Sequence, residues 1–272
     1  AAARLENPIS SEMTHLRPDL LPGLLQAAAR NQARGFADLA LFEVGPVFSG
    51  GEPGEQALVA AGLLAGATGP RAPQGARRPV DLYDAKADME AVLAALGAPE
   101  KRMIFRDAPV WFHPGRSGRV GLGPQKTLAV FGELHPKVLR DFDVKGPAVA
   151  FVVIPDAVPQ PKAGGTARPA LVLHDLQVVE RDFAFVVDAR VAALDLVNAA
   201  AGADKALIEA VSVFDEFAGP AAEAQMGAGK KSLAISVRLQ PTEKTLTEKD
   251  IEAVAAKIVE KVGKATGGSL RG

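Results

Sequence analysis

Histidine is the side chain best suited to ligate a metal ion or to act as a general base near neutral pH. His113 and His135 each precede a proline, which favours extended or turn backbone over an active-site constellation. No two histidines have the paired spacing of a zinc-binding helix. We therefore expect surface or turn histidines and no metal site at the four positions, His15, His113, His135 and His174.

Nucleophilic catalysis has no obvious candidate either. The chain contains no cysteine, which removes thiolate nucleophiles and disulfides and is compatible with a reducing compartment. No serine stands in the G-x-S-x-G pattern of a hydrolase elbow. The residue types and their spacing therefore predict no catalytic residue.

Two glycine-rich segments look like nucleotide-binding loops but lack the required spacing. In the first, 227–232, Lys231 separates the Gly-Lys pair from the serine, and Ala224 stands where the phosphate-binding loop has its first glycine. In the second, Gly121-Leu122-Gly123 precedes Pro124, whereas a dinucleotide fingerprint needs a helix to begin there. We interpret the second segment as a hairpin turn and expect no nucleotide hydrolysis.

Length and composition indicate a globular chain of roughly two domains. Apolar residues make up 48% of the 272 residues, and charged residues 23%. The net charge of −1 provides no global field to attract nucleic acid, so any RNA contact must use a local surface. The sequence shows neither a basic leader with an apolar stretch nor an apolar run long enough for a bilayer. We therefore expect a cytoplasmic protein with no membrane partner.

A segment rich in proline and glycine, 154–169, divides the chain into two predicted domains. In the first, 1–153, strand-length apolar runs are separated by Gly/Pro clusters, and two segments have a helical period. This pattern predicts an α+β domain with one mainly antiparallel sheet. We expect strands at Leu39–Phe48, Leu58–Ala65, Thr127–Glu133 and Val149–Val153, and helices at Pro22–Arg34 and Ala85–Leu96.

The second predicted domain, 170–272, has the element order β-α-β-β-α-β, which is that of a ferredoxin-like fold. The stretch 216–229, rich in glycine and alanine, is expected to be a loop. We expect strands at 182–187, 208–215, 232–239 and 269–271, and helices at 192–201 and 248–265.

The last predicted helix has the clearest pattern in the chain. Thr247 and Asp250 form a capping-box pattern at its start. Its apolar stripe of Ile251, Val254, Ile258 and Val262 must pack on a sheet. We expect the other helix of this domain to cover the same face of the sheet through Val191, Leu194 and Val197, which leaves the opposite face open.

The open face is where the sequence predicts a binding function. Strict alternation in 232–238 places Leu233, Ile235 and Val237 under the helices, and Ser232, Ala234, Ser236 and Arg238 on the other side. Such a row of short side chains lets an unstacked base approach, and an aromatic beside it can stack on that base. Phe217 is the best aromatic candidate, although an aromatic at this position could simply close a loop.

Several segments of the first domain resemble, in family order, the β subunit of bacterial phenylalanine tRNA synthetase. The longest is Asn7–Leu25, which is similar to that family's "NP-S-E---LR-SLLPGLL" signature. The others are Leu41–Phe48, Asp81–Lys86, Phe112–Ser117 and Phe131–Pro136. The resemblance implies a class II synthetase-like antiparallel-sheet domain, truncated at its N-terminus.

The second domain resembles the family's ferredoxin-like anticodon-binding module. The similar segments are Glu180–Phe185, Val213–Asp215, Gly229–Ala234, Lys244–Thr247 and Leu270–Gly272. Because the family's β subunit is much longer, the chain is expected to be a C-terminal fragment that lacks the editing domain. The expected α+β architecture is thus a truncated synthetase-like domain followed by an anticodon-binding domain.

The resemblance implies a non-catalytic part of an aminoacyl-tRNA ligase. In an (αβ)2 assembly, the α subunit activates phenylalanine with ATP and Mg2+ and charges tRNA(Phe), while this part supports α and binds the anticodon. It implies no cofactor in the fragment itself and no DNA partner. Two alternatives remain open from the residues: a stand-alone small-molecule-binding enzyme or regulatory protein with a ferredoxin-like domain, and a tRNA-independent RNA-binding protein.

By motif position, the resemblance implies four anticodon-binding residues. Phe217 corresponds to the aromatic that stacks on the anticodon, Asp215 and Ser232 match positions that contact that base, and Ala234 lies beside them.

Lys230, Lys231 and Arg238 are candidates for phosphate contacts, although lysines in a loop are more often solvated charge. Residues 170–272 hold 12 basic and 15 acidic side chains, a net charge of −3, so we expect weak, salt-sensitive RNA binding by this domain alone.

Overall fold

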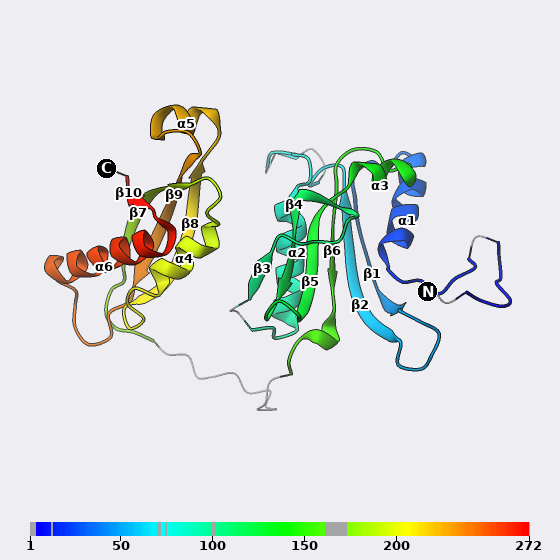
Figure 1. Ribbon diagram of the computed structural model, residues 1–272, viewed down its shortest axis with the longest axis horizontal. Coiled ribbons are helices and arrows are strands. Elements are labelled where there is room, and N and C mark those ends of the chain that lie inside the picture. The colour runs from blue at the N-terminus through cyan, green and yellow to red at the C-terminus, as the bar shows by residue number, and fades with distance from the viewer. Residues whose placement is uncertain are drawn as a thin grey trace. The chain divides into compact units, whose positions relative to one another are not determined.

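The computed structural model describes residues 4–11, 13–69, 72–73, 75–99, 102–160 and 173–271. The chain forms two compact units, Ala1–Gly165 and Thr166–Gly272, and each is described by itself (Figure 1). The predicted limits 1–153, 154–169 and 170–272 remain predictions, since residues 161–172 lie outside the described part.

The first unit is built on a six-stranded antiparallel sheet with the order β1-β2-β6-β5-β4-β3. The four predicted strands are confirmed, and the hairpin turn at Gly121-Leu122-Gly123 joins β4 to β5. The strands are β1 (Leu39–Phe48), β2 (Gln56–Ala65), β3 (Met103–Phe105), β4 (Phe112–Gly121), β5 (Thr127–Leu134) and β6 (Ala148–Val153).

Helices α1 (Leu21–Ala33) and α2 (Leu82–Ala95) cover opposite faces of this sheet (Figure 1). Along β6, Ala150 packs in the core with α1, whereas Phe151 and Val153 pack in the core with α2. The ring of Phe151 also occupies the space above Gly62 of β2, where a Cβ atom would lie 2.3 Å from its Cε1. Both faces of the sheet are therefore buried at its central strand β6.

Three features of the first unit differ from the sequence prediction. Helix α2 begins at Leu82 rather than at residue 85, because Asp81 and Asp84 form a capping box. Strands β3 and β4 were not predicted. In β4, Pro114 and its neighbouring glycines look like a loop, and an irregular register between Phe112 and Ser117 accommodates them. Two short helices were also missed, α3 (Pro136–Asp141) and the 3-10 helix η1 (Pro155–Ala157).

The second unit has a four-stranded antiparallel sheet with the order β10-β7-β9-β8, which is the ferredoxin-like topology predicted from the sequence. The segment 216–229, expected to be a loop, contains helix α5, and this expectation was wrong. The elements are β7 (Val179–Asp188), α4 (Ala193–Ala201), β8 (Ile208–Phe217), α5 (Pro220–Met226), β9 (Lys230–Leu239), α6 (Glu248–Thr266) and β10 (Ser269–Leu270).

Helices α4 and α6 pack on the same face of this sheet, as predicted (Figure 1). On α6, the predicted capping box of Thr247 and Asp250 is present, and the helix ends at Gly267 in the left-handed conformation. Val191, just before α4, packs against this core as predicted. On α4, however, the buried residues are Leu196 and Ala200, whereas the predicted Leu194 is 38% exposed. Burying each large aliphatic side chain here contributes about 1.5–3 kcal/mol.

Candidate nucleic-acid interface

The four residues expected to form a binding surface lie together on the face of the second sheet that α4 and α6 leave uncovered. Phe217 of β8 is directly opposite Ser232 of β9, and Asp215 is opposite Ala234. These two pairs are neighbours along the strands, because Ser232 and Ala234 lie two residues apart. The pairing of β8 with β9 thus brings an aromatic ring, a carboxylate, a hydroxyl and a small side chain together on the open face.

A β-bulge in β8 makes this arrangement. Val213 is opposite the buried Ile235, so strict alternation would place Asp215 and Phe217 under the helices as well. The register shifts between Val213 and Asp215, and the extra residue, Phe214, moves Asp215 and Phe217 to the open face. Phe214 itself is 59% exposed. The alternation of residues in the sequence does not reveal this bulge.

The open face is less evenly exposed than the alternation predicted. Leu233, Ile235 and Val237 are buried under the helices as expected, and Arg238 is exposed. Ser232, however, is only 4% exposed, and the prediction of an exposed side chain was wrong there. Helix α5, in the segment expected to be a loop, packs near β9. The anticodon role of Ser232 remains a prediction.

Arg271 also belongs to this surface, although it was not predicted as a site residue. Its guanidinium carbon lies 5.9 Å from the centroid of the Phe217 ring, within the range of a cation–π contact. Its backbone N–H donates to the carbonyl of Ala184 on β7 over 2.7 Å. Because β7 and β9 separate Arg271 from β8, its side chain must extend over the small residues of the open face. A guanidinium there can donate hydrogen bonds to base edges or phosphate.

The three candidate phosphate contacts have different surroundings. Lys230 lies opposite Asp188 on the open face. Lys231 follows on the other face, where it is 11% exposed and its ammonium lies 2.9 Å from a carboxylate oxygen of Glu216. Arg238 lies roughly 20 Å along the strand from Ser232. The geometry ranks Lys230 first, and all three assignments remain predictions.

Both Arg238 and Asp188 already have ionic partners. Arg238 contacts Glu209 at 2.7 Å and Glu180 at 3.3 Å, and the hydrogen bond to Glu209 raises its pKa most. Two hydrogen bonds from Arg190 hold the pKa of Asp188 below its usual range, the larger effect coming from the backbone N–H and the next from the side chain. The charge of Lys230 makes a smaller contribution. Carboxylates therefore neutralise much of the basic charge near this face.

Two histidines have structural roles. The Nδ1 atom of His113, in strand β4, accepts a hydrogen bond from the N–H of Gly115 at 3.1 Å. His135 caps helix α3, and its Nδ1 accepts from the N–H of Lys137 at 3.1 Å. Extended or turn backbone was predicted at both positions and is confirmed. Within the described ranges, no three potential ligands converge on a metal site.

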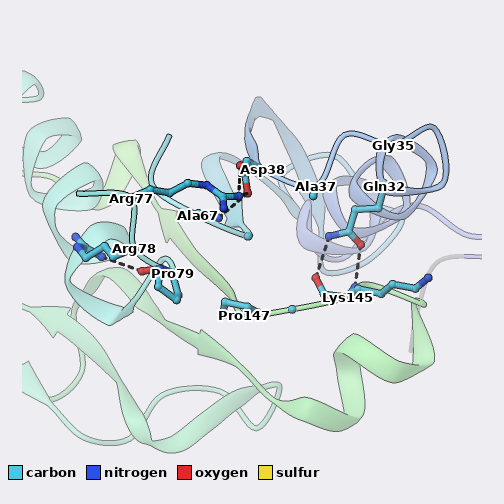
Figure 2. Close-up of a pocket in the computed structure, with 12 residues that line it drawn as sticks. Gln32, Gly35, Ala37, Asp38, Ala67, Arg77, Arg78, Pro79, Lys145 and Pro147 are labelled. Carbon is cyan, nitrogen blue, oxygen red and sulfur yellow. Dashed lines mark hydrogen bonds and ion pairs between the residues drawn. The ribbon is translucent and has the colours of Figure 1, made fainter. Parts of the chain in front are cut away.

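A cavity of about 510 Å3 in the first unit gathers several polar side chains (Figure 2). Both carboxylate oxygens of Asp38 accept from Arg77, at 3.0 and 2.7 Å, and this contact lowers the pKa of Asp38. Gln32 donates to the carbonyl of Lys145 and accepts from its N–H, as Figure 2 shows. These groups satisfy one another, so the cavity is a structural junction.

Two family models match the chain. One, described as the phenylalanyl tRNA synthetase beta chain CLM domain, matches residues 1–153. The other, described as a ferredoxin-fold anticodon binding domain, matches residues 175–271. In the part of the chain that the structure describes, no helix is long and apolar enough to cross a membrane.

Curated relatives match over almost the whole chain. The phenylalanine–tRNA ligase beta subunit of Cereibacter sphaeroides is 74% identical over 271 residues, which cover 100% of this chain and 34% of that protein. The subunit of Ruegeria pomeroyi is 73% identical with the same coverage, and that of Rhodospirillum rubrum is 55% identical over 98% of this chain and 33% of that protein. The chain spans about a third of the length of these relatives.

A solved structure of pyrrolysyl-tRNA synthetase from Desulfitobacterium hafniense is also similar, with a TM-score of 0.39 and 16% identity. The similar region covers 57% of this chain and 50% of the chain of that synthetase.

Proposed function

The chain belongs to the phenylalanyl-tRNA synthetase β-chain family, whose model matches more than half of the chain, and we propose that the second unit binds the anticodon of tRNA(Phe). The observation that carries this proposal is the bulge in β8, which sets Asp215 and Phe217 opposite Ala234 and Ser232 on the uncovered face. A ferredoxin-fold anticodon-binding model matches the same region.

Each residue has a role that its chemistry suits. An unstacked anticodon base stacks on Phe217, and the carboxylate of Asp215 accepts hydrogen bonds from amino or imino groups of that base. Ser232 contributes a hydroxyl, while Ala234 leaves room for the base to approach the strand. Arg271, beside the ring of Phe217, adds cationic charge where the nucleotide binds, and Lys230 is the first candidate for a phosphate contact.

We propose that the first unit has no catalytic role and supports a partner, the α subunit, in an (αβ)2 ligase. In that assembly α would use ATP and Mg2+ to charge tRNA(Phe) with phenylalanine, in the cytoplasm. Family membership supports this part of the proposal, and the internal pairing of Arg77 with Asp38 in the cavity of the first unit is consistent with it.

The test is the affinity of the chain for tRNA(Phe) at low salt, with Phe217→Ala compared with the wild type. Loss of one stacked base costs about 1–3 kcal/mol, so we expect Kd to rise roughly 5- to 150-fold. Phe42→Ala is the matched control, because Phe42 is an 80% exposed phenylalanine on β1 of the other unit. Equal effects of the two substitutions would refute the role of Phe217.

A further inference from the structure

A second concave surface lies in the first unit, between helix α1 and helix α3, and has a volume of about 390 Å3. We call it the Trp111 pocket. Its floor is formed by core residues, with Leu21 and Leu25 each 2% exposed and Leu134 3% exposed. Val138 and Phe142 of the α3 region complete the apolar lining. An apolar hollow of this size accommodates an aromatic or large aliphatic side chain.

Asp19 is the one ionisable residue that lines the Trp111 pocket. Its Oδ1 atom accepts a hydrogen bond from the N–H of Leu21 at 2.8 Å, which fixes the carboxylate at the start of α1. Burial raises the pKa of Asp19, although that hydrogen bond opposes the shift. A carboxylate has lone pairs for further donors, and in apolar surroundings its charge is costly until a cation pairs with it.

The rim of the Trp111 pocket is open and apolar. Trp111 is 39% exposed, and the adjacent Val110 is 87% exposed. Small-molecule sites usually enclose most of their ligand, whereas exposed apolar residues beside a shallow hollow are typical of protein–protein contacts. The curated relatives are about three times as long as this chain, so much of the polypeptide that could cover such a rim lies outside it.

We propose that the Trp111 pocket receives a polypeptide segment that inserts one apolar side chain between Leu25 and Phe142 and places a lysine or arginine beside Asp19. Charge complementarity selects the basic residue, since the lining offers one negative group and no positive one. The apolar lining selects the neighbouring side chain. This interaction is separate from anticodon binding and does not depend on it.

Trp111 is the only tryptophan of the chain and therefore reports on its own pocket. We would titrate the chain with two blocked dipeptides, Phe-Lys and Phe-Glu, and follow the tryptophan fluorescence. We expect saturable binding of Phe-Lys about fivefold tighter than that of Phe-Glu, the ratio that corresponds to a partly exposed ion pair. In Asp19→Asn the two affinities should become equal.

Two further arms keep the test decisive. Val138→Phe fills the pocket and should abolish the response to both peptides, while circular dichroism confirms that each variant folds. If Asp19→Asn does not fold, high salt must reduce the Phe-Lys preference of the wild type. Overturning results are an absent or unsaturable response to Phe-Lys, equal affinities in the wild type, or phenethylamine binding as tightly as Phe-Lys, which would indicate a small-amine site.

Discussion

The two sheets of this chain differ in how many of their faces helices cover. In the first unit, α1 and α2 lie on opposite faces, and the central strand β6 is buried at every position but Val152, although the edge strand β1 has exposed residues such as Phe42. In the second unit, α4 and α6 cover one face, and β9 alternates between buried and more exposed residues along most of its length. The centre of the first sheet is therefore closed on both faces, whereas the described part of the second sheet has one face that its helices leave open.

Substitutions on the two faces of β9 should change the stability of the second unit by very different amounts. Ile235→Ala removes a fully buried side chain from the core under the helices and should destabilise the second unit by about 2–5 kcal/mol. Ser236→Ala, the neighbour on the open face, should change stability by no more than about 0.5 kcal/mol. Urea unfolding of both variants measures the difference, and similar losses would contradict a sheet covered on one face.

Two carboxylates, one in each unit, should have smaller effects on stability, and these effects should depend on pH. The hydrogen bond from Lys257 lowers the pKa of Asp204, so this group stabilises the fold above its unfolded pKa of about 3.9 and loses that contribution as pH falls through the folded value. Burial raises the pKa of Asp19, so ionisation of Asp19 disfavours the fold as pH rises above about 3.9.

The two substitutions should therefore act in opposite directions. At pH 7, Asp204→Asn should reduce stability by up to about 1 kcal/mol, whereas Asp19→Asn should leave stability unchanged or raise it. The difference in stability between each variant and the wild type should become smaller when unfolding is measured near pH 3. Destabilisation by both variants at pH 7 would show that the hydrogen bond to Leu21 outweighs the burial of Asp19.

Much of this comparison could be predicted from the sequence, because local patterns determine it. The ten-residue strand Leu39–Phe48 and the helix α6 with its capping box were predicted almost to the residue. The alternation in β9 correctly placed Leu233, Ile235 and Val237 under the helices. Periodicity and capping are properties of neighbouring residues, so a single sequence contains them.

The missed features depend on contacts between residues distant in sequence. The bulge at Phe214 is visible only once β8 is paired with β9. Arg271 approaches Phe217 because β10 folds back beside β7, although the two residues are far apart in the chain. The burial of Ser232 likewise could not be read from the alternation, which predicted an exposed side chain. Non-local pairing decides such details.

We propose that the open face of the second unit reads the anticodon. The most direct test compares the affinity of the wild-type chain for tRNA(Phe) with that for the same tRNA carrying an altered anticodon, at low salt. We expect weak binding that favours the native anticodon. Phe217→Ala should remove that preference and leave the salt-dependent part of the affinity unchanged. Equal affinity of the wild type for both tRNAs would contradict anticodon recognition by this surface.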